Sequence, residues 1–291
     1  MVIGKNRKNK LNAADIVIAV IILFLVIITV IPFMNLISLS LSSNKAILEN
    51  GNLLFPKGFT VLAYKYILSS KAIYISFLVT ILITATSTVF NLVVTIVSGY
   101  VLSVKGLPCR RGMMLFVLIT MVFSGGLIPS YLVNSSLGLV DTFWVLTVPG
   151  AVSAYSIFLM KNFIMQIPDG LRDAAQIDGA GPIRILVHVI VPLSVPIIAT
   201  LSLFCAVGKW NDWFSAVIYI KKERWLIPIQ TLMQNLVVNT DTGANTDINM
   251  GEFSEAFQSA LIVVSILPIV IAYPFVQKYF VKGMFIGSVK E

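Results

Sequence analysis

The sequence predicts an all-α membrane protein with six transmembrane helices. Of its 291 residues, 57% are hydrophobic and only 12% are charged, and the mean hydropathy is +0.92. Soluble domains are roughly half apolar and about a quarter charged. Six apolar runs meet or approach the ~20 residues that a helix needs to cross a bilayer. The runs are 16–41, 72–104, 112–133, 142–160, 189–207 with a polar continuation to 220, and 256–277. Because backbone groups in lipid must be satisfied internally, we expect each run to be helical.

The first run resembles a secretion signal only in its basic start. Lys5, Arg7, Lys8 and Lys10 precede it. Its apolar part is far longer than the ~7–15 residues of a signal sequence, and no small-residue cleavage site follows it. We therefore expect a retained first helix, preceded by a short tail of residues 1–15 and followed by one membrane domain of residues 16–291.

The basic residues predict the orientation of this domain. The net charge of +8 comes from short clusters between the apolar runs, which is typical of membrane orientation rather than of nucleic-acid binding. The N-terminal tail, the loops 105–111 and 161–188, and the tail after residue 277 carry most of the Lys and Arg, whereas the loop 134–141 carries none. Both termini are accordingly expected in the cytoplasm.

Two segments on the opposite, outer side are unusually long, at 44–71 and 221–255. The second contains an Asn, Asp, Thr and Gly cluster that is typical of an exposed loop. Each segment could be a contact surface for an external partner or cargo, or a solvated linker. The sequence leaves both interpretations open.

The residue types that perform chemistry are sparse. Cys109 and Cys205 fall at different depths of a spanning arrangement, which argues against a disulfide. His188 is the one histidine and has no Cys or acidic neighbour at ligand spacing, so no metal site is predicted. The chain lacks the G-x-x-x-x-G-K-[ST] pattern that cradles nucleotide phosphates. We expect neither enzymatic activity nor a bound cofactor.

The loop 162–188 carries unusually explicit helix punctuation. Asp169 can cap a short helix, Gly179 can supply the left-handed residue that closes it, and Pro182 suits the first turn of a second helix. The pattern predicts a short helix, a tight turn and another helix.

The short helix has one narrow face. Leu171, Ala174, Ala175 and Asp178 lie at i, i+3, i+4 and i+7. In the cytosol, a face that small could enter a cleft of a separate protein, or it could fold back on the membrane helices. On these residues alone both remain open.

The stretch Asp173-Ala-Ala-Gln-Ile-Asp-Gly-Ala180, followed by Val189-Ile-Val-Pro192, resembles the E-A-A-x-x-D-G-A-x8-I-x-L-P loop of permease subunits in bacterial ABC importers. The maltose-permease-like, sugar-importing group is the most similar. Phe55-Pro-Lys-Gly-Phe59 and Trp210-Asn-Asp-Trp213 agree with that group, and Ser124 to Tyr131 resembles its subgroup for complex, in several cases uronate-containing, oligosaccharides. The likeness covers nearly the whole chain.

Three positions depart from the family pattern. Asp173 stands where Glu is usual, and Val189 and Val191 replace Ile and Leu. The aliphatic changes keep apolar character. The acid is one methylene shorter, which alters its reach toward a basic group on a docking partner.

The resemblance implies a type I ABC importer permease fold in the bacterial cytoplasmic membrane, with the segment 169–183 as the coupling loop. It implies as partners a second homologous permease, two cytoplasmic ATPase subunits that hold ATP and Mg, an extracytoplasmic solute-binding protein and an oligosaccharide. The ATPase-coupling residues so implied are Leu171, Asp173, Ala174, Ala175, Asp178, Gly179, Ala180 and, at the mouth of the fifth span, Pro192.

Polar and aromatic residues near the pore are candidates for the sugar pathway, because sugars are held by hydrogen bonds and ring stacking. They are Asn91, Tyr131, Trp210, Asn211 and Asp212. Interfacial anchoring is the competing interpretation of the aromatic residues. Lys209 and Asp212 are costly in lipid and should face protein or water.

Three alternatives compete with a sugar permease. A permease of the same architecture could import another solute, such as an amino acid or phosphonate. A secondary transporter would need ion-coupling groups at mid-membrane and would leave the docking loop unexplained. A membrane-embedded enzyme would need a cluster of acids, histidines or a nucleophile, and the sequence offers none.

Overall fold

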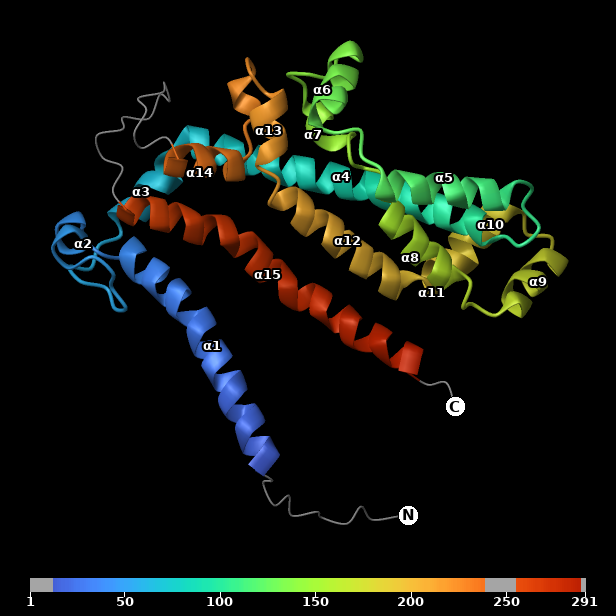
Figure 1. The fold of residues 1–291 in the computed structure, drawn as a ribbon, viewed down its shortest axis with the longest axis horizontal. Helices are drawn as coiled ribbons and strands as arrows, with labels where there is room; N and C mark the ends of the chain where they lie inside the picture. The colour runs from blue at the N-terminus through green and yellow to red at the C-terminus, as the bar shows by residue number, and fades with distance from the viewer. Residues whose placement is uncertain (1–12, 239–254, 289–291) are drawn as a thin grey trace. The chain divides into compact units, whose positions relative to one another are not determined.

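The structure is a computed structural model that describes residues 13–238 and 255–288, and all regular structure in these ranges is helical. Figure 1 shows the order of the helices. The chain divides into two compact units, formed by residues 1–69 with 243–264 and by residues 70–242 with 265–291.

The described residues of the first unit form three helices and the start of a fourth. They are α1 (Ala13–Ser40), α2 (Asn44–Asn50), α3 (Leu62–Ser69) and the beginning of α15 (Glu255–Ser288). The expected outer segment 44–71 contains α3 in its second half. The apolar side chains of α1 from Ile16 to Phe33 are exposed, as expected of a helix whose solvent is lipid.

The polar end of α1 is fixed by the segment that follows it. Asn35 Nδ2 donates to the Leu53 carbonyl at 3.0 Å, and Ser38 Oγ donates to the Leu54 carbonyl at 2.8 Å. Ser42 Oγ accepts from the Lys57 backbone at 3.0 Å. These bonds order the first half of the expected outer segment 44–71.

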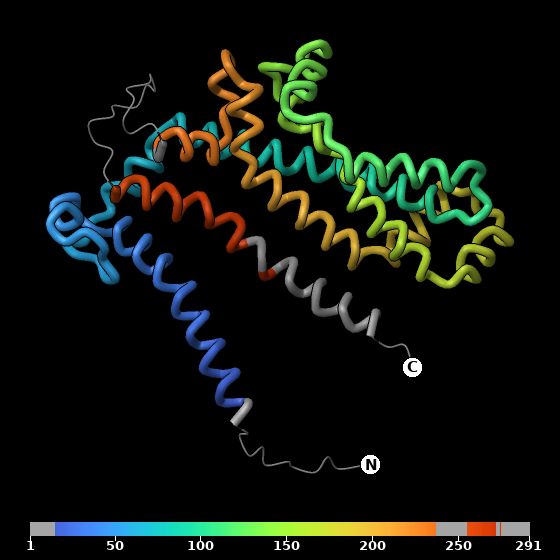
Figure 2. The backbone as a smooth tube through the Cα atoms, viewed as in Figure 1, coloured from blue at the N-terminus to red at the C-terminus, as the bar shows by residue number. Residues whose placement is uncertain are grey.

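The second unit is built around α4 (Lys71–Ser103), a helix of 33 residues. It packs against α8 (Ala154–Ile164) and α12 (Val195–Trp210), as Figure 2 shows. Small or polar residues recur along α4 at intervals of four, with one interval of seven, on the packed side, which lets the helices approach closely. They are Ser76, Thr80, Ser87, Asn91, Thr95, Gly99 and Ser103, all buried. At Gly99 an added Cβ would lie 2.7 Å from Met160 Cγ.

The prediction of one continuous helix over 112–133 is wrong. The structure has α5 (Arg110–Val122) and α6 (Leu127–Ser136), bent by 114°. The Gly125-Gly126 pair separates them, and Gly126 has φ +86°, a conformation that glycine adopts without a steric penalty.

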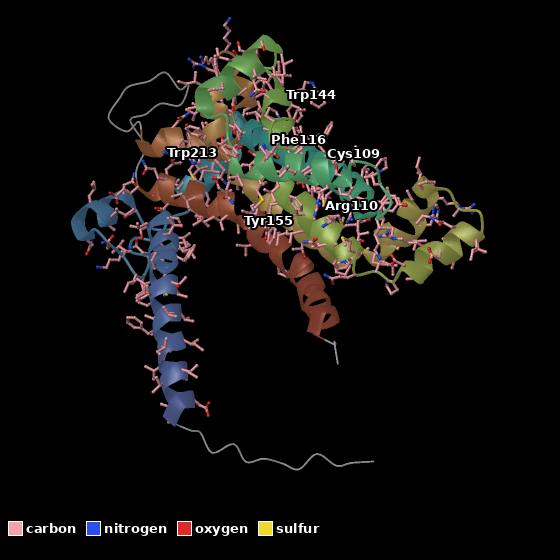
Figure 3. All side chains as sticks on the ribbon, turned by 45° about the vertical axis from the view of Figure 1, so that its right-hand side comes forward. Cys109, Arg110, Phe116, Trp144, Tyr155 and Trp213 are labelled. Atoms are coloured by element: carbon pink, nitrogen blue, oxygen red, sulfur yellow. The ribbon has the colours of Figure 1, made fainter. Side chains whose placement is uncertain are left out.

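The helix expected over 142–160 is also interrupted. It comprises α7 (Phe143–Thr147) and α8, separated by residues 148–153. Pro149 cannot donate a helical hydrogen bond, and Gly150 has φ +81°. In Figure 3, Trp144 and Tyr155 mark the two helices on either side of this break.

The fifth apolar run begins earlier than expected and is bent. Residues 182–193 form α10 (Pro182–Ile185), a π-helical turn η1 (Leu186–Ile190) and α11 (Val191–Leu193), and they meet α12 at 81°. Pro192 lacks the N–H that would continue the α-helical ladder, which suits the widened turn before it. Beyond α12 lie α13 (Phe214–Tyr219), the 3₁₀ turn η2 (Arg224–Leu226) and α14 (Ile229–Val238).

Within the described ranges, two helices are long and apolar enough to cross a membrane, Asp15–Ser40 and Lys71–Ser103. The number rises to as many as four if each bent pair counts as one span, and Glu255–Ile271 is a shorter apolar helix. The helix expected over 256–277 lies inside α15, which contains Pro268 and Pro274.

Candidate functional site: the connection between α8 and α12

The short helix expected in the loop 162–188 is α9 (Asp169–Ile177), and its closure follows the prediction. Gly179 has φ +79°. The Ala180 N–H donates to the Ala175 carbonyl at 2.9 Å, and the Gly179 N–H donates to the Gln176 carbonyl at 3.0 Å. This pair of bonds is a Schellman motif, which satisfies carbonyls that the helix end leaves free. Pro182 starts α10, as predicted.

The predicted cap at Asp169 is wrong. The N-cap residue is Pro168, and no side chain caps the helix. The Asp169 carboxylate instead accepts a hydrogen bond from Lys105 Nζ at 2.7 Å. This contact lowers the pKa of Asp169, first through the hydrogen bond and then through the charge of Lys105. A distant lysine thus competes successfully with the local backbone amides.

The predicted single face of α9 is divided between two sides. Ala175 and Ala180 pack on a core cluster that includes Met160, Ile164 and Ile185. A separate stripe is open to solvent, formed by Leu171, Asp173, Ala174, Ile177 and Asp178. Consecutive residues point about 100° apart on a helix, so neighbouring alanines can serve opposite sides. We call the two sides the packed side and the free side of α9.

The free side exposes large apolar side chains beside its two carboxylates. Ile177 is 86% exposed and Leu171 is 46% exposed. Ile183 at the start of α10 is 78% exposed, and it borders an open groove of about 500 Å³ lined by Pro182, Arg184, Val187 and His188. Large apolar side chains gathered at one place mark a contact surface.

The packed side carries an arginine that sequence reasoning did not single out. Arg172 Nη2 lies 3.3 Å from Ser103 Oγ and 3.3 Å from the Ile164 carbonyl. Its guanidinium carbon lies 5.9 Å from the centre of the Tyr100 ring. An arginine three residues before an alanine of the packed side was the available signal, because that spacing puts both on one side of the helix.

The five candidates for a sugar pathway lie in separate surroundings, and each has a partner in the protein. Asn91 Nδ2 donates to the Ala151 carbonyl at 2.9 Å, and Trp210 Nε1 donates to the Ser265 carbonyl at 3.2 Å. Asn211 Nδ2 bonds back to its own helix at the Val207 carbonyl.

The other two candidates have partners as well. The Tyr131 ring stacks on Tyr219 with centroids 5.9 Å apart, and its hydroxyl accepts from Lys221 Nζ at 3.0 Å. The Asp212 carboxylate accepts from the backbone N–H and the hydroxyl of Ser215. That these five residues line a sugar pathway therefore stays a prediction.

Two polar side chains hold the break between α7 and α8. Lys209 Nζ lies 3.1 Å from the Leu146 carbonyl, 3.4 Å from the Pro149 carbonyl and 3.8 Å from Asp212 Oδ2. Asn91, which lies in α4, donates to the Ala151 carbonyl in the same break. Carbonyls freed by a broken helix at membrane depth need such partners. Lys209 therefore faces protein, in agreement with its expected cost in lipid.

A second anchored turn joins α13 to the segment after it. Asp141 has φ +61°, and its carboxylate accepts from the backbone N–H of Lys222 at 2.8 Å and from that of Lys221. These backbone hydrogen bonds lower the pKa of Asp141. The Tyr131 hydroxyl raises the pKa of Lys221 through their hydrogen bond. The arrangement presents two exposed lysines on a fixed turn.

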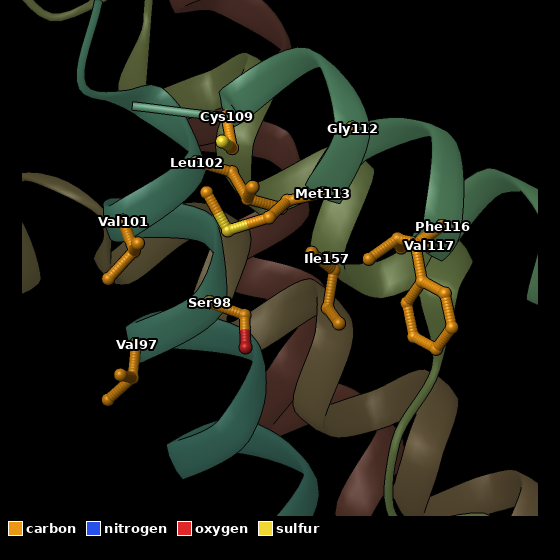
Figure 4. A pocket seen from close by; sticks show the side chains of 10 residues that line it. All are labelled: Val97, Ser98, Val101, Leu102, Cys109, Gly112, Met113, Phe116, Val117 and Ile157. Carbon is orange, nitrogen blue, oxygen red and sulfur yellow. The ribbon is translucent and has the colours of Figure 1, made fainter. Parts of the chain in front are cut away.

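The groove in Figure 4 has the wrong lining for a sugar. It measures about 570 Å³ and is bordered by α4, α5 and α8, with Val97, Val101, Leu102, Met113, Phe116 and Ile157 on its walls. Ser98 and Cys109 are its few polar groups. Among the described residues, no three His, Cys, Asp or Glu side chains gather closely enough to hold a metal ion.

An all-helical chain with broken apolar helices and a short helix exposed on a connecting loop has the architecture of a membrane permease. Residues 67–286 match the family of binding-protein-dependent transport system inner membrane components, and the chain belongs to that family. The resemblance of the loop around Asp173 to importer permeases is thereby confirmed.

Two curated relatives match over at least 90% of the chain. The polygalacturonan/rhamnogalacturonan transport system permease protein YtcP of Bacillus subtilis is 38% identical over 289 residues, covering 97% of this chain and 99% of the relative. Protein LplC of the same organism is 39% identical over 267 residues, covering 90% of each chain.

Two solved structures share the fold. A chain of a bacterial ABC transporter involved in the import of the acidic polysaccharide alginate superposes with a TM-score of 0.85 at 31% identity, covering 96% of this chain and all of the other. A chain of a bacterial alginate ABC transporter, in complex with alginate pentasaccharide-bound periplasmic protein, has a TM-score of 0.58 at 14% identity, which is a likeness of fold alone.

Proposed function

We propose that this chain is the transmembrane subunit of an ATP-driven importer and forms half of the pathway for an oligosaccharide. An extracytoplasmic binding protein delivers the sugar, a second homologous permease completes the pore, and α9 docks on a cytoplasmic ATPase that holds ATP and Mg. The coupling contacts lie at Leu171, Asp173, Ala174, Ile177, Asp178 and Gly179, while Ala175, Ala180 and Pro192 support them from within the chain.

The observation that carries this proposal is the free side of α9. The helix is closed rigidly at Gly179 and packed on one side, yet it leaves Ile177 86% exposed on the other. A monomer gains nothing from exposing that side chain, whereas a cleft in a partner would bury it. In the proposed six-span arrangement, with both termini in the cytoplasm, α9 would lie within reach of a cytoplasmic ATPase.

The test is ATP-dependent uptake in vesicles that contain this chain, the second permease, the ATPase and the binding protein. Gly179→Val forces a β-branched residue into a left-handed conformation, which costs about 1–2 kcal/mol and displaces the turn after α9. Gly138→Val is the matched control, because Gly138 also has a left-handed φ of +68° and, like Gly179, has no atom within 4 Å of an added Cβ.

Uptake should fall at least about tenfold in Gly179→Val, with the ATPase less firmly retained, and should fall much less in Gly138→Val. Equal losses in the two variants would mean that the turn after α9 has no special role. ATP-independent uptake that follows an ion gradient would favour a secondary transporter instead.

The substrate class we propose is an acidic oligosaccharide rich in uronates. YtcP is described as a polygalacturonan/rhamnogalacturonan permease and the structural relative as part of an alginate importer, and both polymers are acidic. The exposed Lys221 and Lys222 agree with an anionic cargo. Competition of labelled oligogalacturonate uptake by oligouronates, but not by neutral oligosaccharides of equal length, would support this class. Competition by an amino acid or a phosphonate would favour the alternative solutes.

A native cysteine can report the orientation of the chain in the membrane. Cys109 is exposed at the start of α5 and is predicted to lie on the cytoplasmic side. In a Cys205→Ser background, a membrane-impermeant maleimide should label Cys109 in inside-out vesicles and not in intact cells. Labelling in intact cells would reverse the proposed orientation.

A further inference from the structure

The packed side of α9 is fixed to two other helices at their C-terminal ends by one side chain. Arg172 Nη2 lies 3.3 Å from the Ile164 carbonyl in the last turn of α8 and 3.3 Å from Ser103 Oγ, the last residue of α4. Helix C-termini carry partial negative charge from unpaired carbonyls, so a cation is favoured there.

The contact with α4 is made twice within one turn. Ser103 Oγ donates to the Tyr100 carbonyl at 2.7 Å, so the hydroxyl passes the arginine contact on to the α4 backbone. The guanidinium also lies over the Tyr100 ring, 5.9 Å from its centre. A planar guanidinium can bond at its edge and stack on its face at once, which an ammonium cannot do.

Arg172 differs from the other ion contact of α9. The Lys105–Asp169 pair is shorter, at 2.7 Å, but its side chains are 72% and 60% exposed. Exposed pairs contribute little because water and salt screen them. Arg172 is half-buried and Ser103 is buried, so their contact is shielded from solvent.

The chain path makes this contact mechanically important. α9 is joined covalently to α8 through residues 165–168 and to α10 through residues 178–181. It has no such connection to α4, which ends at Ser103, far away in sequence. A displacement of α9 therefore reaches α4 directly only through side-chain contacts, and indirectly through α8, which packs on α4.

The helix that receives such a displacement is α4, which extends through the second unit. Near its other end, Thr80 Oγ1 accepts from the Ile229 backbone N–H at 2.9 Å, at the start of α14. Midway, Asn91 holds the carbonyl of Ala151 in the break between α7 and α8. Movement at the C-terminal end of α4 is therefore linked to both.

We propose that Arg172 is a positioning residue that transmits movement of α9 to α4. This inference rests on the proposed docking of α9 to an ATPase and adds the route by which the membrane helices respond. Ala174 and Ile177 on the free side make the docking contact, and Arg172 on the packed side carries the displacement onward.

The experiment uses the complete importer in proteoliposomes and compares Arg172→Met with wild type. Methionine keeps much of the side-chain volume while removing the guanidinium. Three quantities are measured: the ATPase retained on purification, the rate of ATP hydrolysis, and the sugar taken up per ATP hydrolysed. We expect the first two to stay within about twofold, and the uptake per ATP to fall roughly tenfold. Arg172→Lys should recover only part of the loss.

Arg111→Met is the matched control, because it removes an exposed arginine from the start of α5 without touching α9. It should keep wild-type uptake per ATP. A second readout is the distance between spin labels at Gln176→Cys on α9 and Val101→Cys on α4, in a Cys109→Ser and Cys205→Ser background. Addition of ATP should leave that distance unchanged with Arg172 and should change it in Arg172→Met.

Uptake per ATP that stays within twofold of wild type in Arg172→Met would overturn the inference. If that variant fails to assemble, Ser103→Ala is measured instead, because it keeps the arginine and removes its partner on α4. Reduced uptake per ATP in Ser103→Ala would support the route, and unchanged uptake per ATP would reject it. A wild-type complex that retains no ATPase would instead refute the proposed function.

Discussion

Two regions of the second unit use polar and charged residues in opposite ways. At the break between α7 and α8, Lys209 and Asn91 point inward and bond carbonyls that the chain would otherwise leave unsatisfied. At α9, Asp173 and Asp178 face outward beside the exposed Ile177. The first region maintains the fold of one chain, and we propose that the second offers a surface to another. Substitutions in the two regions should therefore fail differently.

The largest effect is expected at Lys209. Its side chain is 14% exposed, and Lys209→Met would leave two carbonyls and the Asp212 carboxylate without their cation. Removing one member of a buried ion pair costs about 3–5 kcal/mol, and because the Asp212 side chain is 26% exposed we expect a loss at the lower end of that range. The thermal midpoint of the purified chain in detergent should fall sharply.

Asp212→Asn in addition to Lys209→Met should recover part of that loss, because the second change removes the uncompensated charge. A Lys209→Met chain that is as stable as wild type would remove the distinction between the two regions.

Helix spacing should respond next most strongly. Gly99→Ala places a Cβ 2.7 Å from Met160 Cγ and 3.1 Å from the Lys161 backbone nitrogen, and such overpacking costs about 1–3 kcal/mol. Gly112→Ala is the control, since this helical glycine has open space around it and alanine is the better helix former. Thermal unfolding should separate the two, and equal midpoints would show that α4 and α8 can move apart without penalty.

Substitutions on the free side of α9 should leave stability unchanged and weaken the contact with the ATPase. Ile177→Asp changes a side chain that is 86% exposed, so stability should stay within about 0.5 kcal/mol of wild type. Retention of the ATPase should fall about tenfold or more, because a charge would enter an apolar contact. Leu48→Asp on α2 is the matched control at 88% exposure, and it should leave retention unchanged.

The smallest effect is expected at the Lys105–Asp169 pair. Its lowered Asp169 pKa means that the contact is complete above the ordinary aspartate range and is lost only as pH falls through the lowered pKa. The protection factors of the α9 amides, which are corrected for the intrinsic pH dependence of hydrogen exchange, should therefore not change between about pH 8 and pH 5. A marked loss of protection across that window would show that another group controls the position of α9.

The local features of the α8–α12 connection could be predicted because they depend on single residues. A glycine that must adopt a positive φ and a proline at a helix start can be recognised from residue type and local pattern. Gly179 and Pro182 lie where they were expected. Asp169 was predicted to cap because capping is also local. Its actual partner, Lys105, is 64 residues away and lies outside what a local pattern contains.

The breaks in the third and fourth runs show a different limit. Hydropathy averages over a window and does not distinguish a straight helix from one interrupted at Gly126 or Gly150. The pathway candidates show a third limit. Residue type identifies Asn91 as able to bond a sugar hydroxyl, but only the fold reveals that the residue is buried and that its amide nitrogen already donates to the Ala151 carbonyl.

The most direct test of the account uses the two adjacent alanines of α9. Ala174 is exposed on the free side, and Ala175 packs on the core cluster inside the chain. Each is replaced by cysteine in a Cys109→Ser and Cys205→Ser background, and the assembled importer is treated with a short bifunctional maleimide. The account predicts that Ala174→Cys becomes linked to the ATPase while Ala175→Cys does not. Linkage from Ala175→Cys alone, or from neither position in an assembled complex, would contradict it.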